Sequence, residues 1–275
     1  MIGVNTFGLT RKIQEDLHGT FQAVAAAGYQ ELELLLYPSK EQGNVPFGVA
    51  TEESIGMLLE EAKKNGLLVH SVHVFASVGT AFISAETVAS SILKIYKDYK
   101  IDTFVFSGMF RDVEGAKQWG IYLRQLAELV KGTDCKILYH NHSDEFTPVT
   151  VNGTTMNALD FFFSAAGKDV GLQLDIGWAG VAGDEVGIAG KYADRIVSIH
   201  LKDFIPETRG KYEATNMPTE HFSAIGCGEI RIGDVLAMRT AFSRFNGSII
   251  VDQDRSTANI LEDIAIGYRN IIALL

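Results

Sequence analysis

Cysteine is scarce in this sequence, and its scarcity excludes two kinds of stabilising chemistry. The 275 residues include only Cys135 and Cys227, whose spacing fits neither a disulfide framework nor a thiolate metal site. There is also no run of about 20 apolar residues to span a bilayer, and the amino terminus lacks the basic and apolar segments of a secretory signal. We therefore expect a cytoplasmic protein with no membrane partner.

Basic residues are too few to outweigh the acidic ones. The chain has 24 Lys and Arg against 34 Asp and Glu, which gives a formal net charge of −10. Such a charge repels a nucleic-acid backbone, so we expect no nucleic-acid partner. A length of 275 residues is usual for one eight-stranded α/β barrel, and 47% hydrophobic residues can fill one core. We therefore predict a single domain over residues 1–275.

Short runs of β-branched and aromatic residues recur eight times along the chain and are typical of strands. They lie at 2–7, 29–35, 68–74, 103–107, 136–142, 171–176, 196–204 and 248–254. Stretches with helical spacing lie between them, such as 51–66, 115–131 and 257–275. Eight alternations of strand and helix favour a closed parallel barrel, so the predicted α/β fold is a single-domain (β/α)₈ TIM barrel. The longest irregular stretch, about 205–233, is expected to cover the site.

Polar and apolar side chains alternate along the predicted strands, so each strand has one polar and one apolar face. The apolar face packs under the helices, which directs the polar face into the barrel mouth. Active sites of this fold form there, at the carboxyl ends of the strands. Five polar residues on these faces are predicted to bind a small-molecule substrate: Asn5, Glu33, His73, Ser107 and Asp254.

Four further residues lie at equivalent heights on four consecutive strands: His140, Asp175, His200 and Asp252. Neighbouring strands run about 4.8 Å apart, so these side chains can converge on one point. Burying two imidazoles and two carboxylates together without a cation is costly, which favours a site for one divalent metal ion. The ligand mixture suits Mn²⁺, Zn²⁺, Co²⁺ or Fe²⁺ and does not choose among them.

Several sequence motifs follow one another between residues 136 and 254. They are Tyr139-His140-Asn141-His142 with Glu145-Phe146, Leu174-Asp175-Ile176-Gly177, Ile199-His200-Leu201-Lys202-Asp203, Gly226-Cys227-Gly228-Glu229-Ile230 and Val251-Asp252-Gln253-Asp254. In this order they resemble the sugar phosphate isomerase/epimerase family, one of the xylose-isomerase-like TIM barrels, alongside inosose dehydratase, tagatose 3-epimerase and endonuclease IV. The resemblance spans the whole chain.

The resemblance implies a metal held by a carboxylate on the fifth strand, an aspartate on the sixth, a histidine on the seventh and a glutamate on the eighth. Asp175 and His200 match, whereas His140 and Asp252 stand where the family has glutamates. In the family's epimerases those glutamates exchange a proton next to a carbonyl, through an enediolate intermediate. A metal-bound imidazole cannot act as such a base, and Asp252 reaches about 1.5 Å less far than a glutamate.

Proton transfer would then fall to other polar groups of the mouth. The predicted catalytic residues are His142, Glu145, Lys202 and Asp252. The leading hypothesis is a divalent-metal-dependent isomerase or epimerase of a keto- or aldo-sugar that works through an enediolate. Elimination needs only one base and one acid. The alternative is therefore a metal-dependent sugar lyase or dehydratase, similar to inosose dehydratase or acting by β-elimination on a 3-keto glycoside.

Two other classes of protein remain open to test. A non-catalytic sugar-binding barrel would also explain the altered glutamate positions. A nuclease similar to endonuclease IV would need a basic groove, which the net charge of −10 disfavours. Barrels of this type often associate through loops and outer helices, so the sequence allows a homodimer or a tetramer.

Overall fold

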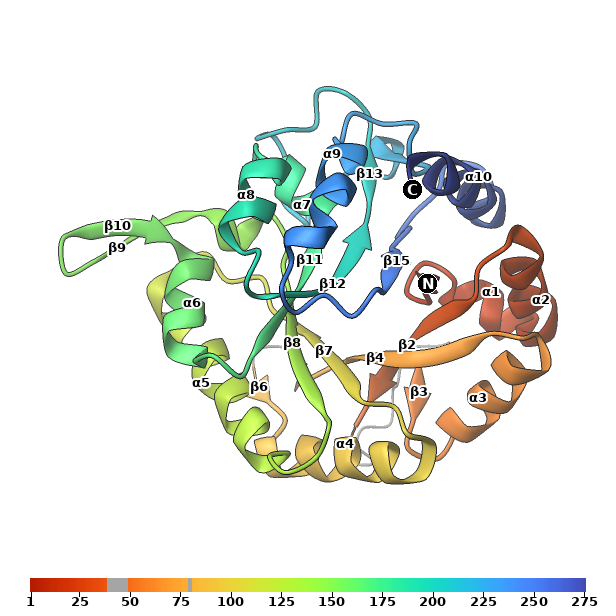
Figure 1. Ribbon diagram of the computed structural model, residues 1–275, viewed down its shortest axis with the longest axis horizontal. Helices are drawn as coiled ribbons and strands as arrows, with labels where there is room; N and C mark the ends of the chain where they lie inside the picture. Colours follow the sequence, from red (N-terminus) through yellow and green to blue (C-terminus); the bar gives the residue numbers. More distant parts are fainter. Residues whose placement is uncertain (39–48, 79–80) are drawn as a thin grey trace.

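A closed barrel of eight parallel strands forms the centre of the computed structural model, which describes residues 1–38, 49–78 and 81–275 (Figure 1). Around the barrel the strands are β1 (Ile2–Asn5), β2 (Glu31–Tyr37), β4 (Leu68–Val74), β7 (Thr103–Ser107), β8 (Lys136–His140), β11 (Gly171–Asp175), β12 (Ile196–Leu201) and β15 (Ile249–Val251). Pairing of β1 with both β2 and β15 closes the ring, and β3 (Ala50–Thr51) extends β2. The predicted (β/α)₈ barrel is confirmed.

Helices surround the barrel on its outside, as the outer ring in Figure 1 shows. They are α1 (Thr10–Glu15), α2 (Leu17–Ala27), α3 (Ile55–Lys64), α4 (Ala85–Tyr99), α5 (Val113–Leu129), α6 (Ala158–Ala166), α7 (Ile176–Val181), α8 (Glu185–Lys191), α9 (Ile232–Ala237) and α10 (Ile260–Leu274). Single turns of 3₁₀ helix lie at η1 (Asp144–Phe146), η2 (Thr219–His221) and η3 (Met238–Ala241). Within this described part, no helix is both long and apolar enough to cross a membrane.

The main core lies between the strands and the helices. Strands β2, β11 and β12 are buried over their whole length, as expected where helices cover one face of a parallel strand and the barrel interior covers the other. Tyr139 and Phe162 show the packing of the outer layer, with ring centroids 4.4 Å apart. A second, smaller cluster of Val105, Leu138 and Val197 lies apart from this core.

Three barrel strands end earlier than the sequence predicts. Strand β8 ends at His140, β12 at Leu201 and β15 at Val251, so the residues that follow them are no longer part of the barrel sheet; Asp203 and Phe204 form β13 of a separate ribbon. Beyond the end of β8, side-chain hydrogen bonds replace the backbone hydrogen bonds between strands. The Asn141 side chain donates to the Asp175 carbonyl oxygen and accepts from the Asp175 backbone nitrogen. Predictions of strand up to residues 142, 204 and 254 were therefore too long.

Short antiparallel ribbons occupy some of the loops. The ribbon of β9 (Pro148–Val151) and β10 (Thr154–Asn157) projects from the barrel beside α6 (Figure 1). Its turn residues Asn152 and Gly153 both have positive φ, the conformation that a tight two-residue hairpin needs. The other ribbons pair β5 (Ser77–Val78) with β6 (Ala81–Phe82) and β13 (Asp203–Phe204) with β14 (Phe222–Ser223).

The loop after β12 is fixed by a buried carboxylate that follows Lys202. Asp203 accepts hydrogen bonds from the backbone nitrogens of Gly226, Gly228 and Ile230 at 2.9–3.1 Å. Gly228 is required there, because an added Cβ would lie 2.2 Å from an Asp203 oxygen. The glycine-containing motif 226–230 therefore serves to hold the loop against the barrel mouth.

A second buried carboxylate clamps the same loop from α8. Glu185 is fully buried and accepts two hydrogen bonds from the Arg209 guanidinium, at 2.7 and 2.8 Å, and one from the Arg231 backbone nitrogen. Burial opposes ionisation of Glu185, but these donors lower its pKa to about 2. Both arginines thus bind Glu185.

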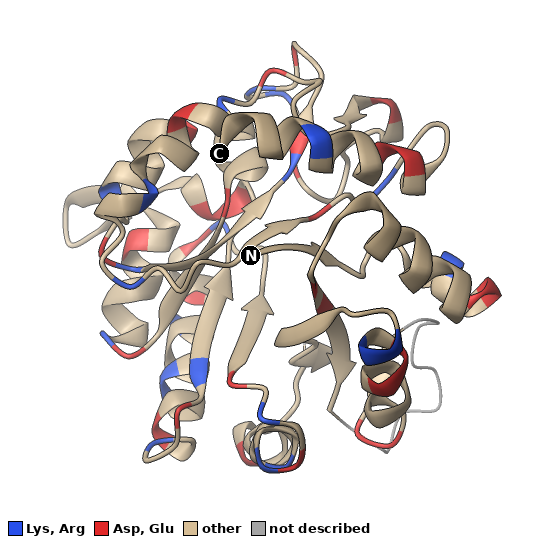
Figure 2. Ribbon diagram, turned by 45° about the vertical axis from the view of Figure 1, so that its right-hand side comes forward, with Lys and Arg blue, Asp and Glu red and all other residues tan. Residues whose placement is uncertain are grey.

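Elsewhere Lys, Arg, Asp and Glu are interspersed along the outer helices (Figure 2).

We predict that Glu185→Gln lowers the free energy of unfolding by about 2 kcal/mol, since it leaves the partly buried Arg209 guanidinium without its counter-charge and a buried donor without its acceptor. The folded-state pKa lies below the value of about 4.3 in an unfolded chain. The contribution is therefore complete above about pH 5 and is lost as the pH falls toward 2. Urea unfolding of both proteins from pH 7 to pH 3 measures it.

The control is Asp184→Asn, a neighbouring exposed carboxylate whose contact with Arg231 is solvated and whose N-cap role asparagine preserves. It should change stability by less than about 0.5 kcal/mol. A Glu185→Gln variant as stable as the parent at pH 7 would contradict the clamp.

Candidate metal centre and active site

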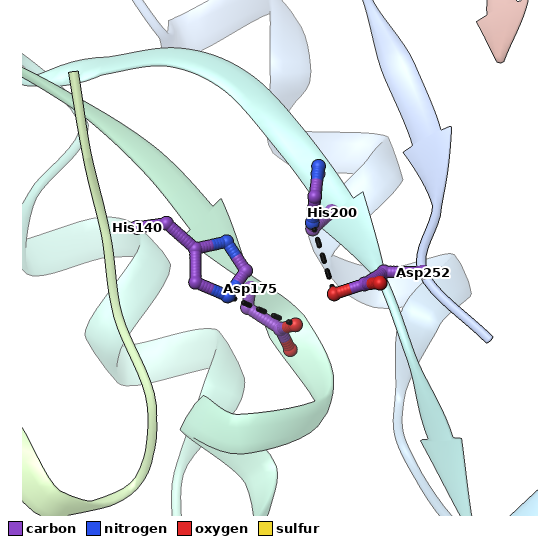
Figure 3. Close-up of side chains that lie close together, drawn as sticks. All are labelled: His140, Asp175, His200 and Asp252. Atoms are coloured by element: carbon purple, nitrogen blue, oxygen red, sulfur yellow. Dashed lines mark hydrogen bonds and ion pairs between the residues drawn. The ribbon is translucent and has the colours of Figure 1, made fainter. Parts of the chain in front are cut away.

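The four predicted ligands meet inside the barrel mouth. His140 ends β8, Asp175 ends β11, His200 lies on β12 and Asp252 follows β15, and all four are buried. One nitrogen or oxygen atom from each lies within 4.8 Å of the corresponding atom of every other (Figure 3). The predicted convergence of these residues is therefore present in the structure.

Asp175 is held so that one oxygen faces the cluster. Its Oδ1 accepts a hydrogen bond of 2.8 Å from the Trp178 backbone nitrogen and so caps the start of α7. Its Oδ2 is buried without a hydrogen-bond partner among the described residues and lies 3.8 Å from His140 Nε2. Burial raises the pKa of Asp175 to about 6, against the lowering effect of Lys202. The end of β11 thus presents one carboxylate oxygen, Asp175 Oδ2, that has no hydrogen-bond donor among the described residues.

His200 lies between two carboxylates. Its Nε2 is 2.9 Å from Glu33 Oε1 and its Nδ1 is 3.2 Å from Asp252 Oδ2. Burial disfavours the imidazolium, but the charges of Glu33 and Asp252 and their hydrogen bonds raise the pKa of His200 to about 10. His140 differs, because burial and the charge of His200 hold its pKa well below the usual range.

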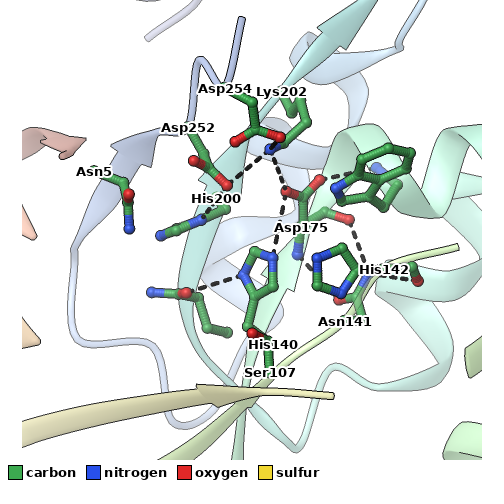
Figure 4. A network of polar contacts seen from close by, with 12 residues as sticks. Asn5, Ser107, His140, Asn141, His142, Asp175, His200, Lys202, Asp252 and Asp254 are labelled. Atoms are coloured by element: carbon green, nitrogen blue, oxygen red, sulfur yellow. Dashed lines mark hydrogen bonds and ion pairs between the residues drawn. The ribbon is translucent and has the colours of Figure 1, made fainter. Parts of the chain in front are cut away.

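Lys202 is the buried ammonium of the site. Its Nζ donates to Asp252 at 2.9 Å and to Asp254 at 2.6 Å, and it lies 3.9 Å from Asp175 Oδ2. Burial opposes its charge, but these carboxylates raise the pKa of Lys202. Its backbone packs against Gly177 of α7, where an added Cβ would come within 2.5 Å of the Lys202 carbonyl oxygen. Figure 4 shows the surrounding network.

These residues fit a divalent cation. Asp175 Oδ2 and Asp252 Oδ1 are buried acceptors with no partner among the described residues, and buried carboxylate oxygens in that state are costly. Four carboxylates, including Glu33 and Asp254, are near Lys202 and His200, so negative charge is in excess. Two imidazoles and two carboxylates are a donor set that first-row divalent ions accept.

A cavity of about 200 Å³ opens above the cluster. Predicted site residues that line it are Asn5, His73, Ser107, His140, His142, Lys202, Asp252 and Asp254. Aromatic side chains complete the wall, namely Phe7, Phe75, Trp178 and Phe222. Sites for drug-sized ligands measure roughly 300–1,000 Å³, so this cavity suits a smaller molecule.

His142 and Trp178 each bring an unpaired polar atom to the cavity. His142 Nδ1 and Trp178 Nε1 are buried, have no hydrogen-bond partner among the described residues, and belong to rings 5.8 Å apart. Burial and the charge of Lys202 lower the pKa of His142 to about 3, so its imidazole is neutral at physiological pH. Both groups are therefore available to a ligand.

Four residues predicted for the site lie outside the cavity wall: the metal-ligand candidates Asp175 and His200, and the carboxylates Glu145 and Glu33. Glu145 is fully buried behind β8, where it accepts hydrogen bonds from the Tyr139 hydroxyl and from the His142 backbone nitrogen, and burial raises its pKa to about 8. It supports the turn that carries His142. Glu33 lies below the cluster, with Asn5, Ser71, Gln173 and His200 around its two oxygens. Neither carboxylate faces the cavity.

Sequence reasoning missed two residues that support the cluster. Asn141 links the end of β8 to Asp175, and Gln173 lies between His140 and Glu33. The alternation of side chains along a strand could have indicated Gln173, because it lies on the same inward face of its strand as Asp175. Asn141 gave no such signal, because it lies beyond the end of β8.

Comparison with known families identifies the family of this chain. The family model for the xylose isomerase-like TIM barrel matches residues 21–266, which is most of the chain. The chain belongs to the xylose isomerase-like TIM barrel family. No curated protein matched the sequence.

Solved structures share the fold of this family member at low sequence identity. A sugar phosphate isomerase/epimerase from Parabacteroides distasonis ATCC 8503 is 18% identical with a TM-score of 0.74, covering 99% of this chain and 93% of that one. The probable 3-DHS dehydratase of petrobactin synthesis from Bacillus anthracis is 11% identical with a TM-score of 0.69, covering 98% of both chains. The IOLI protein, solved with a bound zinc atom, is 14% identical with a TM-score of 0.68, covering 99% and 97%.

We predict that the purified protein holds about one divalent metal ion per chain and that Asp175→Ala or His200→Ala removes it while the barrel stays folded. Elemental analysis after dialysis, with circular dichroism on the same samples, measures both. His70→Ala, an exposed histidine outside the cluster, should keep the metal. A parent protein that binds no divalent ion after chelation and reloading would refute the metal centre.

Proposed function

We propose that this protein is a divalent-metal-dependent isomerase or epimerase of a small keto- or aldo-sugar. The observation that carries the proposal is the position of the His140, Asp175, His200 and Asp252 cluster at a cavity of about 200 Å³. Aromatic faces and hydrogen-bonding side chains together line that cavity, which suits the apolar ring faces and the hydroxyls of a sugar.

The cluster would hold one divalent ion through two imidazole nitrogens and two carboxylate oxygens. When bound, such an ion polarises a carbonyl or an adjacent hydroxyl oxygen and makes the neighbouring C–H group more acidic. Asp252 has a second role in the proposal, because it also fixes Lys202 at 2.9 Å. The similar fold of a zinc-binding protein supports a metal here and leaves its identity open.

Two side chains are proposed to move protons. His142 lies on the cavity wall with an unpaired Nδ1 and is the proposed acceptor of the proton from the carbon next to the carbonyl. Its pKa of about 3 makes it a weak base, so this transfer depends on the increased acidity of the C–H group that the bound ion would supply. Lys202 is the complementary donor: Asp252 and Asp254 keep its ammonium in place, where it can stabilise the oxygen that gains negative charge in the enediolate. Glu145 is left out of this role because its two oxygens are occupied behind β8.

A second candidate is a metal-dependent lyase or dehydratase. The two groups proposed to move protons are chemically unlike, one imidazole and one ammonium, whereas epimerisation by two bases needs a similar acceptor on each face of the sugar. One base and one acid suffice for β-elimination. The similar fold of a probable dehydratase is compatible with this alternative.

Isomerisation and elimination differ in their products, and one screen separates them. The metal-loaded protein is incubated in deuterium oxide with keto-sugars and inososes, with and without phosphate groups, and NMR follows both new isomers and loss of water. We predict deuterium uptake at the carbon next to the carbonyl together with a new isomer. Loss of water or of a glycosyl group would favour the lyase. Absence of exchange into any bound sugar would favour a non-catalytic binding barrel.

The proposed base gives a sharper prediction. His142→Ala should lower kcat by a factor on the order of 10²–10⁴, the usual contribution of a positioned acid–base group, and leave the metal content unchanged. Steady-state kinetics and elemental analysis on the same preparation measure the two quantities. His18→Ala, an exposed histidine of α2, is the matched control and should retain full activity. A His142→Ala variant with the kcat of the parent would rule out His142 as the base.

Several expectations stay predictions that the fold does not test. They are a cytoplasmic location, the absence of a nucleic-acid partner, and assembly into a homodimer or a tetramer.

A further inference from the structure

Glu33 is a fully buried carboxylate directly below the cluster, at a position that no ligand in the cavity contacts. Each of its oxygens receives two donors. Oε1 lies 2.8 Å from Asn5 Nδ2 and 2.9 Å from His200 Nε2, and Oε2 lies 2.7 Å from Ser71 Oγ and 2.8 Å from Gln173 Nε2. An ionised carboxylate can only accept hydrogen bonds, so all four neighbouring atoms must act as donors.

This requirement places a proton on His200. Its Nε2 faces Glu33 and therefore carries hydrogen. The opposite nitrogen, Nδ1, faces Oδ2 of Asp252, another residue of the four-ligand cluster, at 3.2 Å. Because Glu33 retains the hydrogen on Nε2, the ring would give up its Nδ1 hydrogen when a cation is held.

The same carboxylate acts on His140 through Gln173. Because the Gln173 amide nitrogen donates to Glu33, its oxygen Oε1 points the other way, 3.1 Å from His140 Nδ1. That nitrogen must then be the donor, which leaves His140 Nε2 with a lone pair on the side of Asp175, 3.8 Å away. Figure 4 shows the ring of His140 beside Asp175.

We propose that Glu33 is a positioning residue that sets the proton location and the ring orientation of both imidazoles in the metal centre. It acts directly on His200 and through the Gln173 amide on His140, so the N–H that each ring keeps is on Nε2 in His200 and on Nδ1 in His140. Metal-binding histidines commonly donate their second N–H to such an acceptor, and its loss typically costs 10- to 100-fold in metal affinity. The inference rests on the proposed metal-dependent function.

An isosteric change at residue 33 tests this without altering volume. Glutamine has one acceptor oxygen and one NH₂ group, whereas each of the two Glu33 oxygens now meets two donors. In either orientation of the new amide, two donors would face its NH₂ group. Glu33→Gln therefore breaks the donor pattern around one or both imidazoles while the side chain keeps its shape.

The chain offers a matched control two residues earlier on the same strand. Glu31 is also fully buried on β2, but the hydrogen bonds to its oxygens come from Ser248 at 3.2 Å and not from an imidazole of the cluster. Glu31→Gln makes the same chemical change in a similar environment. A general effect of removing a buried charge would appear in both variants, whereas loss of imidazole positioning would appear only in Glu33→Gln.

The experiment measures Zn²⁺ affinity by competition with a chelator and ring ¹⁵N NMR spectra of ¹⁵N-histidine-labelled protein, with and without Zn²⁺. Glu33→Gln should bind Zn²⁺ 10- to 100-fold more weakly and shift the ring signals of His200 and His140. Glu31→Gln should bind within about threefold of the parent and leave both ring patterns unchanged. Gln173→Met should shift only the His140 signals, because Glu33 still contacts His200 directly.

Ring spectra of Glu33→Gln that match the parent would overturn the inference, as would unchanged Zn²⁺ affinity. If Glu33→Gln fails to fold, Gln173→Met decides: an unchanged His140 ring pattern in that variant also overturns it. Failure of the proposed function has a different signature, namely a parent protein that binds no Zn²⁺ at all. In that case the ring spectra of the metal-free variants still show whether Glu33 positions the two rings.

Discussion

The structure depends on compensating negative charge inside a closed barrel. Glu33, Asp175, Asp252 and Asp254 lie near one another with little or no access to water, and the chain supplies only Lys202 and His200 as nearby cations in the described network. Carboxylates in such surroundings persist only when donors or cations surround them. The order of the cluster, the charge of Lys202 and the proton positions on the imidazoles all follow from this requirement.

The carboxylates of the site differ in how fully hydrogen-bond donors surround their oxygens. At the bottom, Glu33 is satisfied by four donors, whereas Asp175 and Asp252 each keep one bare oxygen near the cavity. These two carboxylate oxygens therefore lie without a hydrogen-bond donor where a cation and a sugar would both be in reach. The polar groups that face the cavity without partners, His142 Nδ1 and Trp178 Nε1, lie on its wall. This separates structural carboxylates from those available for chemistry.

Much of this could be predicted from the sequence, because parity is a direct consequence of strand geometry. The inward placement of His140, Asp175 and His200 follows from alternation along short strands, and the parallel barrel follows from the strand–helix repeat. The contacts of Glu33 could not be predicted. Alternation along a strand indicates that a side chain points into the barrel, but it does not indicate which residues of other strands that side chain will contact. The contacts of Glu145 could not be predicted either, because its bonds to the Tyr139 hydroxyl and the His142 backbone nitrogen depend on the turn after β8. The hairpin at 148–157 had a signal in its Asn152-Gly153 turn that strand counting overlooked.

Metal-edge anomalous diffraction from crystals grown with Zn²⁺ or Co²⁺ tests the central claim most directly. The account predicts one strong peak among His140, Asp175, His200 and Asp252, with Lys202 still bonded to Asp254 and Glu33 still bonded to His200. A difference map with no peak at this point, in crystals where those four side chains keep their present positions, would contradict it.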